Sequence, residues 1–99
     1  MKEVWTDQAL ARLTEIEDHI AMNDPGAALR HVDRLVKRGD SLDRFSSRGR
    51  RVPELSRSDL RELIEGNFRI VYRIRVRVVE ILTVFEAHHL LPLDDLDHA

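Results

Sequence analysis

Apolar residues recur every three to four positions through the first half of the chain, which is the spacing of amphipathic helices. A first helix is predicted over residues 7–22, with an apolar face formed by Leu10, Leu13, Ile16 and Ile20. Asp24 and Pro25 then supply a cap and a first helical position for a second helix. We extend this helix through Gly39 to about Asp43, because one interior glycine costs only about 1 kcal/mol relative to alanine. The two helices are expected to form an antiparallel hairpin.

The period of the pattern changes from 3.6 to 2 in the second half of the chain, which predicts strands. Strands are expected over 60–65, 68–74 and 78–87, with Gly66-Asn67 as a tight turn between the first two. The middle strand alternates Phe68, Ile70, Tyr72 and Ile74 with Arg69, Val71, Arg73 and Arg75. One face of this strand is therefore predicted to be core and the other basic.

The last strand is apolar on both sides, with Val79, Ile81 and Phe85 assigned to one face and Leu82 and Val84 to the other. This pattern is typical of a central strand that is covered on both faces. A short strand is expected over 2–5, an irregular connection over 48–58, and a flexible acidic tail over 92–99. The predicted fold class is α+β: a two-layer domain in which an N-terminal strand and a helical hairpin pack on a small antiparallel β-sheet.

Composition excludes several classes of protein. The 99 residues suffice for a single domain over 1–99, and the absence of cysteine excludes disulfides and thiolate metal sites. No apolar run resembles a signal peptide or approaches the roughly 18 residues of a membrane span, so a cytoplasmic protein without membrane contact is expected. No Gly-rich phosphate loop is present. The five histidines show no helical His-x-x-x-His spacing, so no metal or other cofactor is predicted.

The net charge of −2 conceals a strong asymmetry along the chain. Residues 44–77 contain ten basic side chains, all arginine, against four acidic ones, whereas 1–43 and 78–99 are net acidic. The guanidinium fork suits bidentate contact with phosphate or carboxylate, although a solvated strand face explains the same pattern. The helical half, being acidic, is a poor candidate for a DNA-binding helix-turn-helix.

Three motifs in the second half carry a family resemblance. They are Gly-Arg-Arg-Val-Pro-Glu (49–54), Arg-Glu-Leu (61–63) and Phe-Arg-Ile-Val-Tyr-Arg (68–73). In this order, behind a helical half, they resemble the RelE/ParE superfamily of bacterial toxins. The resemblance implies that the N-terminal strand joins the sheet and that the hairpin packs on one face of it. It also implies one of two activities, which are ribosome-dependent cleavage of mRNA and inhibition of DNA gyrase.

A ribonuclease requires a base, an acid and cations around the transferring phosphate. The candidates for such a site are Arg61, Arg69, Arg73, Glu86, His88 and His89. However, neighbouring strand residues point to opposite faces, so at most one of the two histidines is expected to face a common site. By resemblance, Ile64 stands where the nucleases carry an arginine, and residues 88–91 stand where they carry basic residues and a tyrosine. The modest net charge also fits poorly with binding to a dense phosphate surface.

The resemblance therefore favours the ParE-type toxin of a type II toxin–antitoxin system, which binds gyrase and stabilises its cleaved-DNA complex without performing chemistry. The candidate target-binding residues are Arg50, Arg51, Arg61, Arg69, Arg73, His88 and His89. The implied partner is an antitoxin, through which alone the toxin would meet DNA. Leu90, Leu91, Leu93 and Leu96 could bind that antitoxin or pack on the protein's own helices. An mRNA endoribonuclease and an inert binding module of the same fold remain as alternatives.

Overall fold

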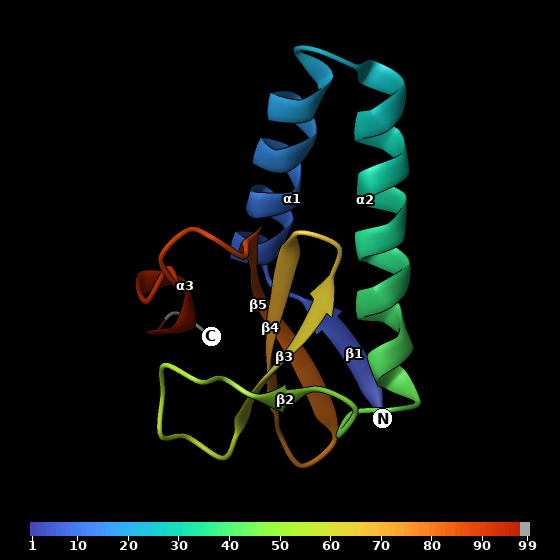
Figure 1. The fold of residues 1–99 in the computed structure, drawn as a ribbon. Coiled ribbons are helices and arrows are strands. Elements are labelled where there is room, and N and C mark those ends of the chain that lie inside the picture. Colours follow the sequence, from blue (N-terminus) through green and yellow to red (C-terminus); the bar gives the residue numbers. More distant parts are fainter. Residues whose placement is uncertain (98–99) are drawn as a thin grey trace.

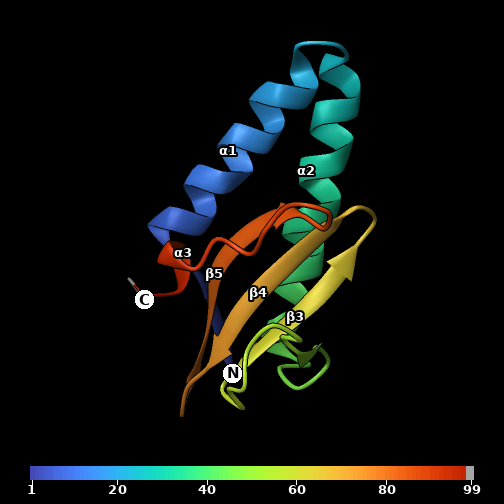
Figure 2. The same ribbon diagram turned by 60° about the vertical axis from the view of Figure 1, so that its left-hand side comes forward.

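The computed structural model describes residues 1–97 as one mixed β-sheet with a long helical hairpin on one face (Figures 1 and 2). The helices are α1 (Asp7–Ala21), α2 (Pro25–Asp40) and the short α3 (Asp94–Asp97), with a 3₁₀ turn, η1 (Ser41–Asp43), after α2. The strands are β1 (Lys2–Trp5), β2 (Arg50–Arg51), β3 (Leu60–Glu65), β4 (Phe68–Ile74) and β5 (Val78–Glu86). This arrangement confirms the predicted α+β class.

The sheet has the strand order β1-β5-β4-β3-β2. β1 runs parallel to β5 and pairs only with its first half, from Val78 to Ile81, whereas the other neighbours are antiparallel. The predicted junction of β1 with the sheet is thus correct. The two-residue strand β2 was not predicted, because it lies in the irregular connection and its pairing with β3 depends on residues 61 and 62.

The helical hairpin covers one face of the sheet and buries the larger core cluster. Both helices begin with a side-chain cap, since the side chain of Thr6 accepts from the N–H of Ala9 and that of Asp24, the predicted cap, accepts from the N–H of Ala27. The helix continues through Gly39, where the close packing against the sheet requires glycine, because a Cβ at this position would collide with the ring of Trp5. α2 itself ends at Asp40, so the last residues of the predicted helix form the 3₁₀ turn.

The opposite face of the sheet carries a second core, which corrects the prediction of a basic face. It is formed by Val52, Leu60, Val71, Leu82, Phe85 and Leu96. The connection before β3 and the C-terminal segment cover this face, as the views in Figures 1 and 2 agree. The arginines of β4 therefore lie beside a covered layer and not on an open strand face.

A β-bulge in β5 corrects the predicted assignment of faces. Val71 pairs with Thr83 and Tyr72 with Ile81, so Leu82 is an extra residue on the β5 side. The side-chain alternation shifts by one residue at this point. Val84 consequently packs with the helical core and Phe85 with the second core, the reverse of the prediction from simple alternation.

The C-terminal segment packs onto the sheet as far as Leu96, in contrast to the flexible tail predicted from residue 92. Leu96 is 4% exposed and belongs to the second core. The buried carboxylate of Asp95 accepts hydrogen bonds from Arg12 and from Thr83 (2.7 and 2.8 Å). Residues 98–99 of the predicted tail lie outside the described part of the chain. Within residues 1–97, no helix combines the length and apolar character needed to cross a membrane.

Candidate functional site

The Gly-Arg-x-Val-Pro-Glu motif fastens the connection before β3 to the sheet. The buried backbone N–H of Gly49 donates to the hydroxyl of Tyr72 (2.9 Å), and that hydroxyl donates to the carbonyl of Ser46 (2.8 Å). A Cβ on Gly49 would lie 2.5 Å from the carbonyl oxygen of Glu62, so the close approach requires glycine. Burial of the Tyr72 hydroxyl raises its pKa. The glycine of the motif therefore has a structural role.

Arg69 is the centre of a buried ion-pair network on the second face of the sheet. Its Nε donates to Glu62 (2.8 Å), and its two terminal nitrogens donate to Glu54 (2.7 and 2.6 Å). Glu62 also accepts from Arg50 (2.7 Å), and the Arg69 guanidinium stacks over the ring of Phe85 at 4.8 Å. The side chains of Arg69 and Glu62 are 8% and 0% exposed.

The hydrogen bonds of this network favour the charged forms of Arg69 and Glu54. The hydrogen bonds that Arg69 donates to Glu54 raise the pKa of Arg69, although burial opposes the shift. The same hydrogen bonds lower the pKa of Glu54. Arg69 is thus held by two carboxylates inside the protein, and its guanidinium is not presented to a target surface.

The remaining arginines of the predicted nuclease set also have partners within the fold. Arg61 donates to the carbonyl of Gly49 (2.9 Å), and Arg73 donates to Glu80 (3.0 Å), which Arg75 also contacts. Burial alone would raise the pKa of Glu80, but the hydrogen bonds from the two arginines outweigh it and lower the pKa. Arg51 is exposed and forms no ion pair with any residue in the described range 1–97.

Glu86, His88 and His89 come together at the end of β5. The Glu86 carboxylate lies 3.1 Å from Nε2 of His88 and 3.8 Å from Nε2 of His89, and the two imidazole centroids are 4.5 Å apart. The expectation that the histidines face opposite sides is wrong, because β5 ends at Glu86 and both histidines lie in the following turn. Both side chains are well exposed.

These histidines and the arginines Arg61 and Arg73 lie at opposite ends of the sheet. Arg73 is opposite Glu80 in the register, six residues before Glu86 on β5. At about 3.3 Å per residue this separation is roughly 20 Å. The predicted ribonuclease residues thus do not converge on one reacting centre.

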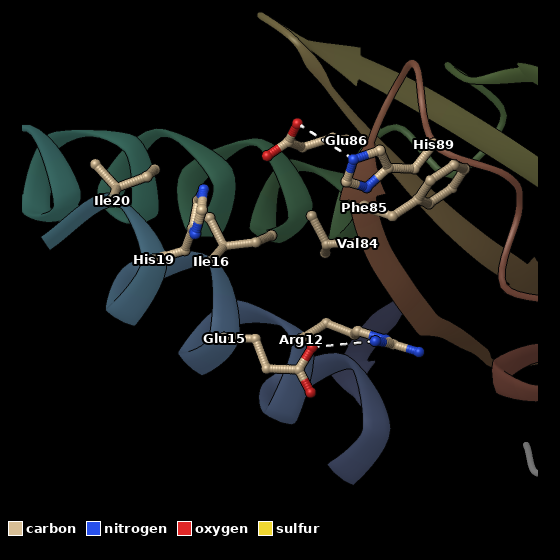
Figure 3. A pocket seen from close by; sticks show the side chains of 9 residues that line it. All are labelled: Arg12, Glu15, Ile16, His19, Ile20, Val84, Phe85, Glu86 and His89. Atoms are coloured by element: carbon tan, nitrogen blue, oxygen red, sulfur yellow. Dashed lines mark hydrogen bonds and ion pairs between the residues drawn. The ribbon is translucent and has the colours of Figure 1, made fainter. Parts of the chain in front are cut away.

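A groove of about 220 Å³ opens beside this strand end, between α1 and β5. Its apolar floor includes Ile16, Ile20 and Val84, and Figure 3 shows Glu86 and His89 at one side of it and the Arg12–Glu15 ion pair at the other. The groove exists because β1 pairs with β5 only as far as Ile81, so the edge of β5 beyond that residue has no strand neighbour on this side in the described chain.

The four candidate leucines divide into two groups. Leu96 is buried in the second core and Leu91 packs partly against it, so these two pack within the fold, but on the sheet face opposite the hairpin and not on the helices as the sequence alternative had it. Leu90 and Leu93 are 93% and 55% exposed. Only these two remain accessible for a partner.

Sequence reasoning missed Arg12 and Asp95 as a structural pair. The hydrogen bond joins residues that are 83 positions apart, and no local sequence motif at either residue predicts it. It also missed the proximity of Glu86 to the two histidines, although the Glu-x-His-His spacing just after a strand is a readable signal for side chains sharing a turn.

The element order and the hairpin-on-sheet arrangement define a RelE/ParE-type domain. The family model described as "ParE toxin of type II toxin-antitoxin system, parDE" matches residues 4–90. The chain therefore belongs to the ParE toxin family of type II toxin–antitoxin systems.

Relatives and a solved structure agree with this family. A protein of Sinorhizobium fredii, Y4kP, whose name describes it as a candidate toxin, is 43% identical over 90 residues, covering 89% of this chain and 90% of its own length. Toxin RelE2 of Caulobacter vibrioides is 46% identical over 61 residues, covering 62% and 65%. A chain from the structure titled "Chromosomal ParDE TA system from P. aeruginosa" superposes with a TM-score of 0.75 at 26% identity, covering 89% and 97%.

Proposed function

We propose that this toxin inhibits DNA gyrase by binding the enzyme and stabilising its cleaved-DNA complex, and that a cognate antitoxin neutralises it. In this proposal the protein acts as an inhibitor and performs no chemistry of its own. Its site of action is the cytoplasm, where gyrase acts on DNA.

The observation that carries the proposal is the internal pairing of the arginines that a nuclease would need. A phosphoryl-transfer site requires cations free to stabilise charge that develops in the transition state. Arg69 and Arg73 are instead neutralised by Glu62, Glu54 and Glu80, and Arg73 lies roughly 20 Å from the histidines. This arrangement supports binding over catalysis.

The exposed members of the candidate set form the proposed target surface. Arg51 is free of ion pairs within residues 1–97, and Arg50 is 61% exposed although it contacts Glu62. His88 and His89 occupy a second exposed position at the end of β5. Exposed arginines such as Arg50 and Arg51 steer association with an acidic partner and set its specificity.

We propose the groove beside β5 as the binding site of the antitoxin. It combines half-buried Ile16 and Ile20 with an unpaired strand edge, and the exposed Leu90 lies in the segment that follows β5. An extended segment could add to this edge through main-chain hydrogen bonds while placing apolar side chains in the groove. The solved relative comes from a ParDE system, which is consistent with such a complex.

Two assays with the purified chain test the target. We expect inhibition of gyrase supercoiling with accumulation of cleaved DNA, and no cleavage of mRNA on translating ribosomes. The opposite pair of results would assign the protein to the ribonuclease class, an alternative favoured by the relative named RelE2. Inactivity in both assays, together with unimpaired growth of an expressing host, would identify an inert binding module.

A charge reversal tests the proposed surface. Arg51→Glu is expected to weaken gyrase inhibition by about tenfold, equivalent to about 1.4 kcal/mol of binding. Arg30→Glu makes the same change at an exposed position of α2 and serves as the matched control. Equal potency of the two variants would remove Arg51 from the target surface while leaving the target assignment to the first pair of assays.

A further inference from the structure

Three side chains of metal-binding type converge at the end of β5. Glu86, His88 and His89 each offer one ligand atom, and these atoms all lie within 4.8 Å of one another. Oε2 of Glu86 is 3.1 Å from Nε2 of His88 and 3.8 Å from Nε2 of His89. None of these groups belongs to the Arg69 network or to either core.

The turn after β5 produces this convergence. The backbone N–H of His89 donates to the carbonyl of Glu86 (3.0 Å), which closes a tight turn directly after the last strand residue. The turn ends the alternation of a strand, so consecutive imidazoles no longer point to opposite faces. Their rings instead meet edge to face near the same carboxylate.

We propose that Glu86, His88 and His89 bind a zinc-type divalent cation. Zinc takes nitrogen and carboxylate oxygen ligands at about 2.0–2.2 Å in a tetrahedron, so its ligand atoms lie about 3.3–3.5 Å apart. The two distances from the Glu86 oxygen lie on either side of this value. Small side-chain rotations suffice to complete the geometry, because both imidazoles are exposed.

The ligand types select the class of metal. Two imidazoles and one carboxylate suit zinc and its late first-row neighbours, whereas magnesium and calcium prefer oxygen ligands alone. Three protein ligands leave a fourth position, and the exposure of His88 and His89 (71% and 61%) opens it to water. Bound metal would clamp the end of β5 to the turn that leads into the C-terminal segment. This proposal does not rest on the proposed inhibition of gyrase.

Calorimetric titration of the full chain, without an affinity tag and after chelator treatment, tests the site with ZnCl₂. We expect saturable binding of one ion and a rise in the thermal unfolding midpoint. Co²⁺ in its place should give the visible absorption of a tetrahedral complex. The variant His88→Ala/His89→Ala should bind Zn²⁺ at least about tenfold more weakly, as should Glu86→Gln, whereas the control His31→Gln should bind as the parent does.

Two results would overturn the proposal. One is the absence of saturable binding to the parent chain, and the other is unchanged affinity in the double variant. If a variant loses its circular dichroism spectrum, histidine ring resonances of the parent chain decide the matter. Zn²⁺ must then shift the His88 and His89 signals, and shifts confined to His19 or His31 would contradict the site.

Discussion

Replacing Arg69 by methionine tests whether the buried ion-pair network supports the fold. Glu62 is fully buried, and Arg69→Met removes its buried partner and leaves only the largely exposed Arg50. Removing one partner of a buried pair typically costs about 3–5 kcal/mol of stability. Because the Arg50 contact remains, we expect the free energy of unfolding to fall by about 3 kcal/mol. Domains of this size have total stabilities of only about 5–15 kcal/mol, so the loss is a large fraction of the whole.

Neutralising the Glu62 carboxylate, which loses its buried partner in Arg69→Met, should restore part of the stability. In Arg69→Met/Glu62→Gln no unpaired charge is buried, and we expect the double variant to be more stable than Arg69→Met by about 1 kcal/mol or more. Urea denaturation, followed by circular dichroism and by Trp5 fluorescence, measures both differences. Arg51→Met is the matched control, because that arginine is exposed and its loss should change stability by less than about 0.5 kcal/mol.

Two results would contradict this prediction. One is an Arg69→Met variant that is no less stable than Arg51→Met, and the other is a Glu62→Gln substitution that does not raise the stability of Arg69→Met. Either result would mean that the network contributes little to the folded state.

Three further substitutions test the other structural assignments. Gly49→Ala should lose about 2 kcal/mol or more in urea denaturation, because the new Cβ would press on the Glu62 carbonyl. Gly26→Ala should be neutral or slightly stabilising, because its Cβ meets the flexible end of Arg30 and, at ordinary contact distance, the Asp24 side chain. Leu96→Ala should cost about 2–4 kcal/mol and the exposed Leu90→Ala less than about 0.5 kcal/mol; similar losses would argue against the packed C-terminal segment. Glu80 has a lowered pKa in the folded protein, so its contribution is present above the unfolded value of about 4.3 and is lost as pH falls through the lower folded value. The stability gap between the parent chain and Glu80→Gln should therefore be greatest near neutral pH and close in acid, and a gap independent of pH would refute this account.

The elements that the sequence predicts well are those with a clean local period. β3 and β4 occur over the predicted residues, and Gly66 adopts the positive φ expected of the turn between them. The periodicity of the sequence cannot reveal that Leu82 is an extra residue in β5, because a bulge is defined by the pairing with β4. The assignment of Phe85 to the wrong core follows directly from that insertion.

The nature of the arginine face could not be read from β4 alone. Alternation of arginine with apolar residues is typical of a solvated strand face, and nothing in positions 68–75 distinguishes that case from a covered one. Two carboxylates neutralise Arg69. Glu62 reaches it from the neighbouring strand β3, whereas Glu54 reaches it only when the connection before β3 folds back over the sheet. The same limit applies to Asp95, whose partner Arg12 lies on the first helix.

The residues that carry the family resemblance are mainly those that hold the scaffold together. Gly49 admits the close approach of the connection to β3, and Glu54 and Arg69 secure it from the other side. A motif with this structural role can be shared by relatives with different targets, because it fixes the fold and leaves the outer surface free to vary. We propose that target choice depends on exposed positions outside the network, such as Arg51 and the Glu86–His88–His89 turn. Substitutions at these exposed positions, and not at Gly49, Glu54 or Arg69, are the ones expected to separate toxicity from stability.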